Sequence, residues 1–94
     1  MQLEVARNDE RSRYEMTLDG RTVGFADYRR QRDTVVFPHT VIEPSMRGQG
    51  FGAELVRRAL DDVRAGGGSV VAQCWYVAQF IDEHPAYADL LAPM

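Results

Sequence analysis

Lysine is absent from this 94-residue sequence, so all 11 of its basic side chains are arginines. Without a lysine the chain can form no Schiff base and has no phosphate-loop ammonium group. Fourteen Asp and Glu residues outnumber the arginines and give a formal net charge of −3. This acidic balance argues against broad electrostatic capture of nucleic acid, so we expect no nucleic-acid partner.

Cysteine is almost absent, since Cys74 is the only one, and His39 and His84 are the only histidines. A single cysteine allows no intramolecular disulfide and no cysteine-rich metal site, so we expect no metal. The sequence also lacks an apolar run of about 20 residues, the length that spans a bilayer, and lacks the pattern of a signal peptide at its N-terminus. We therefore expect a cytoplasmic protein without a membrane partner.

What is present is an ordinary globular composition, with 45% apolar and 27% charged residues. At this length we expect one domain over residues 1–94. Residues up to about 43 alternate in polarity as strands do, with Asp19-Gly20 as a two-residue hairpin turn and Pro38 at an edge or bulge. Later segments have the helical spacing of apolar residues. The predicted elements are strands over 3–6, 14–18, 23–29 and Thr34–Ile42, a helix over Phe51–Ala65, a strand over Ser69–Ala72, a helix over Trp75–Glu83 and a further helical turn within 86–91.

This order, ββββαβα, predicts an α/β domain whose mixed sheet is antiparallel through four strands, with the fifth parallel to the fourth. A glycine-rich segment, Arg47-Gly48-Gln49-Gly50-Phe51-Gly52, lies between the fourth strand and the first helix. Glycines there let backbone N–H groups converge, and the helix dipole adds positive potential, which indicates an anion site.

Two other interpretations of this segment must be weighed. Gly48-x-Gly50-x-x-Ala53 also fits the dinucleotide fingerprint, but that fold needs the loop after its first strand and an acidic residue about twenty positions later. Neither condition is met, because four strands come first and residues 68–70 contain no acid. The other alternative, that the glycines only form a tight turn between strand and helix, remains open.

Read from Arg47, the segment is Arg-x-x-Gly-x-Gly, and here the chain resembles the GNAT-type N-acetyltransferases. Together with His39-Thr40, Cys74 and His84-Pro85-Ala86-Tyr87, it resembles a group of very small, single-domain members. The resemblance implies acetyl-coenzyme A as the cofactor and N-acetyl transfer to an amine of unknown identity, a small molecule or a protein. The cofactor-binding residues that it implies are Val41, Ile42, Glu43, Arg47, Gly48, Gln49, Gly50, Phe51 and Gly52.

The chain also departs from larger members of that family. It is a minimal form that lacks the helices after the first strand and the two C-terminal strands, so its acceptor site has few walls. A homodimer or a partner protein could complete that site. Ile81 stands where the family usually has a tyrosine acid, which leaves a catalytically silent coenzyme A-binding or protein-interaction module as the alternative function.

Candidate catalytic residues follow from the same resemblance. His39 lies on the strand where larger members have a glutamate base, and an imidazole suits proton removal from an ammonium acceptor. Cys74 ends the fifth strand near the expected acyl site and is either a packing residue or a transient acyl carrier. Weaker candidates, each with an ordinary structural explanation, are Glu43, Tyr76, Tyr87 and His84.

Overall fold

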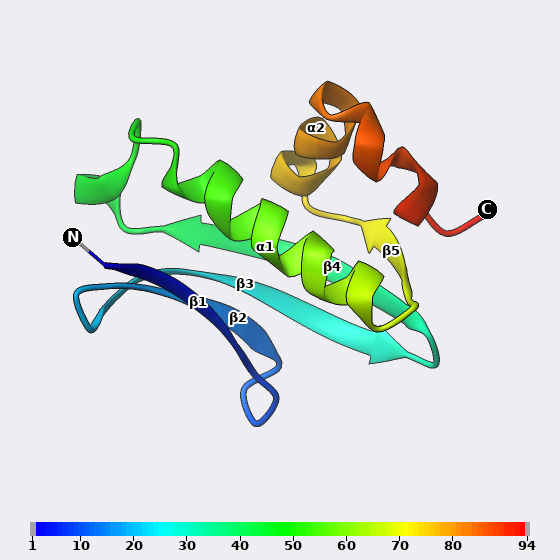
Figure 1. Ribbon diagram of the computed structural model, residues 1–94, viewed down its shortest axis with the longest axis horizontal. Coiled ribbons are helices and arrows are strands. Elements are labelled where there is room, and N and C mark those ends of the chain that lie inside the picture. Colours follow the sequence, from blue (N-terminus) through cyan, green and yellow to red (C-terminus); the bar gives the residue numbers. More distant parts are fainter. Residues whose placement is uncertain (1, 94) are drawn as a thin grey trace.

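The computed structural model describes residues 2–93, which form one sheet with helices on one side of it (Figure 1). The elements are β1 (Leu3–Asn8), β2 (Arg13–Leu18), β3 (Arg21–Gln31), β4 (Thr34–Ile42), η1 (Pro44–Met46), α1 (Phe51–Ala65), β5 (Ser69–Ala72), α2 (Trp75–Glu83) and η2 (Pro85–Leu90), where η denotes a 3₁₀ helix. The predicted order and the bounds of β4, α1, β5 and α2 are confirmed. β1 and β3 extend to Asn8 and Gln31, beyond the predicted Ala6 and Arg29, because backbone pairing continues up to the turns.

The five strands lie in sequence order, β1-β2-β3-β4-β5. β1 to β4 are antiparallel, and β5 is parallel to β4, as predicted. The turn between β2 and β3 has Asp19 at φ 50° and Gly20 at φ 87°, the left-handed backbone that a two-residue hairpin turn requires. None of the helices within residues 2–93 is long and apolar enough to cross a bilayer.

Pro38 lies in a β-bulge of β4. Asp27 pairs with His39 and Arg29 with Val36, so Phe37 and Pro38 on β4 face one residue of β3. Parallel pairing with β5 ends at Phe37, and one further bond follows it, from the Cys74 N–H to the Phe37 carbonyl at 2.8 Å. Beyond this point β4 continues to Ile42 while the chain after β5 turns into α2, so the two segments separate.

Both helices pack against the same face of the sheet and form one hydrophobic core with it. Apolar residues of α1 recur at the helical period and are buried: Phe51, Leu55, Val56, Ala59, Leu60 and Val63. Full burial of a leucine side chain stabilises a fold by about 1.5 to 3 kcal/mol, so this stripe fixes α1 across the strands. No helix of the described chain covers the opposite face, where one row of paired residues crosses four strands: Asn8, Arg13, Asp27 and His39.

Candidate functional site

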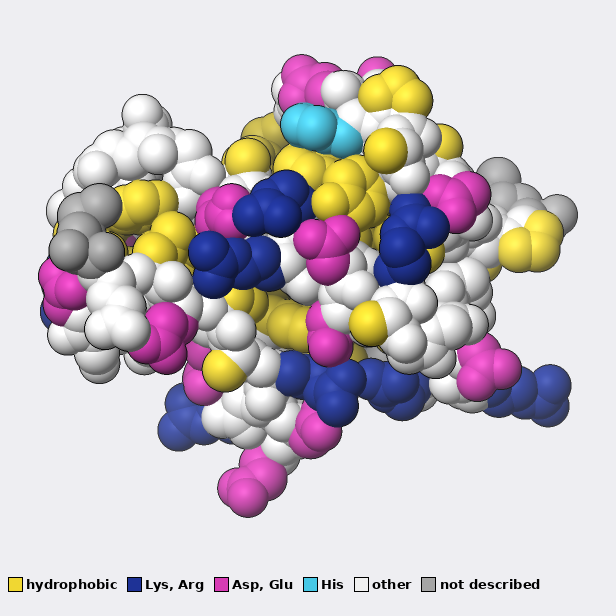
Figure 2. Space-filling view, in the orientation of Figure 1, with side chains coloured by type: hydrophobic (Ala, Val, Ile, Leu, Met, Phe, Trp, Pro, Cys, Tyr) yellow, Lys and Arg dark blue, Asp and Glu magenta, His cyan; other side chains and the backbone are white. Residues whose placement is uncertain are grey.

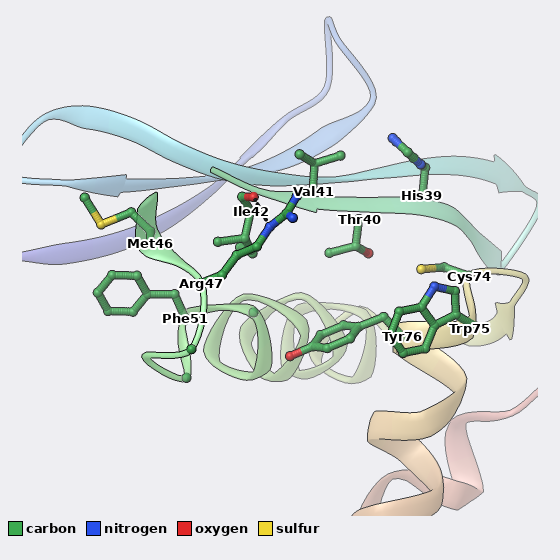
Figure 3. A pocket seen from close by; sticks show the side chains of 13 residues that line it. His39, Thr40, Val41, Ile42, Met46, Arg47, Phe51, Cys74, Trp75 and Tyr76 are labelled. Carbon is green, nitrogen blue, oxygen red and sulfur yellow. Dashed lines mark hydrogen bonds between the residues drawn. The ribbon is translucent and has the colours of Figure 1, made fainter. Parts of the chain in front are cut away.

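A cleft of about 600 Å³ opens where β4 separates from the chain that follows β5 (Figure 3). One wall is the second half of β4, another is the loop leading into α1, and the third is the start of α2. The residues that line it are His39, Thr40, Val41, Ile42, Met46, Arg47, Gly48, Gly50, Phe51, Gly52, Cys74, Trp75 and Tyr76.

The glycine loop supplies the polar end of this cleft. Gly48 and Gly50 have φ values of 81° and 80°. This left-handed backbone conformation is strained for any residue that has a Cβ atom, so it favours glycine. The first N–H to bond back onto the loop is that of Glu54, which donates to the Gly50 carbonyl at 3.1 Å. Within the described chain, the N–H groups of residues 48–53 have no backbone acceptor, and they lie at the positive end of the α1 dipole. The loop therefore presents a set of free donors suited to an anion.

Arg47 connects the loop to β4, because its Nε donates to the Ile42 carbonyl at 3.1 Å (Figure 3). The Glu43 N–H donates to the Val23 carbonyl of β3 at 2.8 Å. Since backbone bonding alternates along an antiparallel strand, the backbone groups of Thr40 and Ile42 are directed away from β3. They form the edge of β4 that borders the cleft and pairs with no further strand, although the Ile42 carbonyl already accepts the bond from Arg47.

Gly52 makes room for a tyrosine. A Cβ atom at this position would lie 2.6 Å from the Tyr76 hydroxyl oxygen, so any larger residue would force the phenol to move. Burial is the main cause that raises the pKa of Tyr76, with a further increase from the Glu83 carboxylate. The phenol therefore keeps its proton at neutral pH and can donate it to an acceptor in the cleft.

Cys74 and Trp75 line the inner end of the cleft. The Cys74 side chain is buried, at 9% exposure, and Cys74 stands at the N-cap position of α2 without a capping hydrogen bond from its side chain. Trp75, by contrast, is 73% exposed, and its ring meets that of Tyr76 edge-on, with 5.6 Å between ring centroids. A large apolar side chain that remains exposed beside a cleft is available for contact with a ligand.

His39 is placed differently from the other cleft residues. It contributes to the lining, but its exposed imidazole lies on the side of β4 opposite to Thr40 and Cys74, 6.2 Å from the Phe25 ring centre (Figure 3). The ring belongs to the sheet face without helices. Its role as a base stays a prediction, and it requires an acceptor that approaches from that face.

Two predicted cofactor-binding residues lie outside the cleft lining. The Glu43 carboxylate accepts hydrogen bonds from Arg21 and Ser45, both at 3.2 Å, and Gln49 is exposed on the loop. Ile81 is buried in the core at 3% exposure, and the Tyr87 hydroxyl donates to Asp61 at 2.8 Å, away from the cleft.

Sequence reasoning did not assign Thr40 or Trp75 to the site. A signal existed for each: Thr40 is adjacent to His39 on the same strand, and Trp75 directly follows Cys74 at the predicted start of a helix.

The chain is similar in fold to several solved structures. A GCN5-like protein from Staphylococcus aureus is 17% identical with a TM-score of 0.74, over 98% of this chain and 90% of that one. YhbS from Escherichia coli, an N-acetyltransferase in complex with CoA, is 22% identical with a TM-score of 0.57, over 64% of this chain and 38% of that one. Salmonella typhimurium yncA, with acetyl-CoA, is 23% identical with a TM-score of 0.59, over 76% of this chain and 47% of that one. The chain thus spans less than half of the length of YhbS and of yncA.

Among proteins with curated descriptions, none matches this chain. The model of the GCN5-related N-acetyltransferase family matches residues 13–90, which includes β2 to η2 and every residue of the cleft. The match extends over most of the chain and agrees with the resemblance that the Arg47–Gly52 segment indicates. The chain therefore belongs to the GCN5-related N-acetyltransferase family.

Proposed function

We propose that this protein transfers an acetyl group from acetyl-coenzyme A to an amine. The observation that supports this most is the cleft itself, which joins a loop of free N–H donors at one end to an edge of β4 that pairs with no further strand along its side. A coenzyme with a charged pyrophosphate and an amide-containing arm requires these two features in this order. Family membership and the similarity to proteins solved with CoA or acetyl-CoA support the same cofactor.

Different residues of the cleft bind different parts of the coenzyme. The amides of residues 48–53 bind the pyrophosphate, and the guanidinium of Arg47, already fixed to Ile42, adds positive charge beside them. The edge of β4 at Thr40 and Ile42 pairs with the amides of the pantetheine arm. This places the thioester at the inner end of the cleft, near Cys74.

Transfer then proceeds by direct attack. The amine nitrogen of the acceptor attacks the thioester carbonyl carbon, the C–N bond forms and the C–S bond breaks, which leaves acetylated amine and the thiolate of coenzyme A. The proton lost from the amine passes to His39 or to water, and the neutral phenol of Tyr76, which lines the same cleft, is a candidate proton donor for the thiolate. Holding donor and acceptor in one geometry supplies much of the acceleration.

The acceptor side is open, since no helix of the described chain covers the sheet face on which His39 lies. We infer that the acceptor is large or that a second copy or a partner protein completes the wall. A strictly monomeric protein that acetylates small amines efficiently would contradict this inference, and sedimentation with steady-state kinetics would measure both properties.

The first prediction tests cofactor binding at the loop. We expect acetyl-coenzyme A to bind the wild type in calorimetric titration and Gly50→Glu to abolish binding, because a carboxylate would occupy the place of the pyrophosphate. Gly67→Glu is the matched control: Gly67 also has a left-handed backbone, with φ 75° and free space around it, but follows the far end of α1. No binding by the wild type at millimolar concentration would contradict the proposed function.

The buried Ile81, at the position of the family's usual acid, favours one alternative, a coenzyme A-binding or interaction module without turnover. Acetyl transfer and thioester hydrolysis with a panel of amines, peptides and polyamines separate the two functions. Binding without turnover across the panel would support the silent module.

A further inference from the structure

The side chain of Thr40 contains a polar atom that the fold leaves without a partner. Its Oγ1 is buried, yet it has no hydrogen-bond partner among residues 2–93. Most buried polar side-chain atoms in proteins are hydrogen-bonded, and leaving one unpaired costs about 1 to 3 kcal/mol. The hydroxyl therefore lowers the stability of the fold, whereas a methyl group in the same place would not.

Packing gives no reason for a threonine here. Thr34, on the same strand, has a hydroxyl that pairs with Ser69 at 3.1 Å, so the sheet can satisfy a β4 threonine when a partner stands opposite. Thr40 pairs with Ala26 of β3 on one side, but on the side of β5 no strand lies beside it, because pairing with β5 ends at Phe37. Because Thr40 lines the cleft, a molecule bound there can supply the missing partner.

The location of Thr40 identifies that partner. Figure 3 shows its side chain on the same side of β4 as Cys74 and Tyr76, in the space between the strand and the start of α2. The glycine loop lies at the other end of the cleft, so a coenzyme held there by its pyrophosphate extends its thioester end toward Thr40. A hydroxyl is a donor, and the thioester offers a carbonyl oxygen as the acceptor.

We propose that the Thr40 hydroxyl donates a hydrogen bond to the carbonyl oxygen of the bound acyl thioester, which makes Thr40 a catalytic residue. This inference rests on the proposed function. Rotation between staggered positions about the Cα–Cβ bond is sufficient to turn the hydroxyl toward the ligand. As the amine attacks, negative charge develops on that oxygen, and a donor already in place stabilises it without reorganisation.

The test uses Thr40→Val, which keeps the shape and replaces the hydroxyl with a methyl group. Without ligand, we expect its melting temperature to rise by about 4 °C or more, because an unpaired buried polar group is removed. With ligand, we expect its preference for acetyl-coenzyme A over coenzyme A to fall roughly tenfold, because only the acetylated form has the acyl carbonyl. Its kcat should fall roughly tenfold or more, and Thr40→Ser should restore most of both losses.

Thr34→Val is the control on the same strand. It removes a paired hydroxyl, so its melting temperature should fall, and its preference for acetyl-coenzyme A should stay at the wild-type value. Equal weakening of both coenzymes in Thr40→Val would assign the hydroxyl to another part of the ligand and overturn the proposal. A lower melting temperature for Thr40→Val with unchanged binding would also overturn it, as a structural role. Failure of the wild type to bind either coenzyme would refute the proposed function instead, while the melting temperatures still report whether the hydroxyl is unpaired.

Discussion

At the scale of single residues, one strand separates the two candidate catalytic side chains. Cys74 is buried on the side of β4 that faces the helices, whereas His39 is exposed on the other side near Phe25. A proton relay within one pocket, with both groups in contact, does not fit this arrangement. The geometry instead suits an acyl donor on one side of β4 and an acceptor on the other.

We therefore predict that His39→Ala lowers kcat by about a hundredfold, the usual size of the loss of a general base, with acetyl-coenzyme A affinity almost unchanged. Steady-state kinetics and titration calorimetry measure the two quantities. His84→Ala is the control, since the His84 ring stacks on Phe80 at 4.0 Å and its Nδ1 lies 2.7 Å from the Phe80 carbonyl, away from the cleft. Equal rates for His39→Ala and wild type would leave water as the proton acceptor.

Cys74 allows a separate prediction about intermediates. An acyl-carrier mechanism requires an acetyl group on Cys74 before any acceptor is added, whereas direct transfer does not. Because Cys74 is 9% exposed, we expect direct transfer: intact-mass measurement after mixing with acetyl-coenzyme A should show no added acetyl group. One added group that disappears in Cys74→Ala would establish the carrier mechanism.

At the scale of elements, one carboxylate ties the first two strands to the long helix. Asp62 of α1 accepts a hydrogen bond from the Tyr14 hydroxyl of β2 at 2.7 Å and one from Arg7 of β1 at 2.9 Å, both on Oδ2. Burial, and then the Asp62 carboxylate, raise the pKa of Tyr14, so its hydroxyl remains a donor at neutral pH. These bonds hold the edge of the sheet to the helix whose N-terminus forms the cleft.

Tyr14→Phe should lower the free energy of unfolding by about 1 to 2 kcal/mol, since a hydrogen bond to a charged group is lost at a side chain that is 2% exposed. Chemical denaturation measures this change. Tyr87→Phe removes a hydrogen bond to Asp61 from a tyrosine that is only partly buried, so we expect a smaller loss. Similar losses in the two variants would show that the Tyr14–Asp62 hydrogen bond stabilises the fold no more than the Tyr87–Asp61 hydrogen bond does.

At the scale of the whole molecule, charges of both signs are interspersed rather than gathered. Figure 2 shows arginine and carboxylate side chains side by side over the face that contains α1. Many of them form ion pairs, including Arg58 with Glu54 at 2.9 Å and Arg64 with Asp89 at 2.8 Å. Such exposed pairs contribute little individually, but they set how stability responds to acid.

We predict that the protein loses stability as the pH falls from about 5 to about 3. The hydrogen bond from Tyr28 is the main cause that lowers the pKa of Asp9, and Arg64 lowers the pKa of Asp89. For Glu54, burial acts to raise the pKa, but hydrogen bonds from Arg57 and Arg58 outweigh it, so its pKa is also lowered. Carboxylates with a lowered pKa bind protons more readily in the unfolded chain, so their stabilisation is complete at neutral pH and is lost in acid.

Melting temperatures between pH 7 and pH 3 measure this dependence. Asp9→Asn should flatten the lower part of the curve, because one of the responsive carboxylates is removed. A melting temperature that stays constant from pH 5 to pH 3 would contradict the prediction.

The sequence by itself determined the order of the elements and the position of the glycine loop. The elements follow from local signals: period-two alternation, helical spacing and the turn residues Asp19-Gly20. Each signal acts through the backbone preferences of a short segment. The Arg47–Gly52 segment could be predicted in the same way, because its glycines determine the loop conformation locally through their left-handed backbone. The family followed from the same residues together with their order.

Only the tertiary structure decided which side of β4 each candidate residue faces and which residues meet in the cleft. The bulge at Phe37–Pro38 shifts the alternation of β4, and no local pattern states on which side of the sheet His39 then lies. The Thr40 hydroxyl is unpaired at a point where β5 no longer runs beside β4. Gly52 contacts the phenol of Tyr76, which lies 24 positions later in the sequence. Contacts between distant segments follow from how the sheet and the helices pack, which is a property of the whole fold.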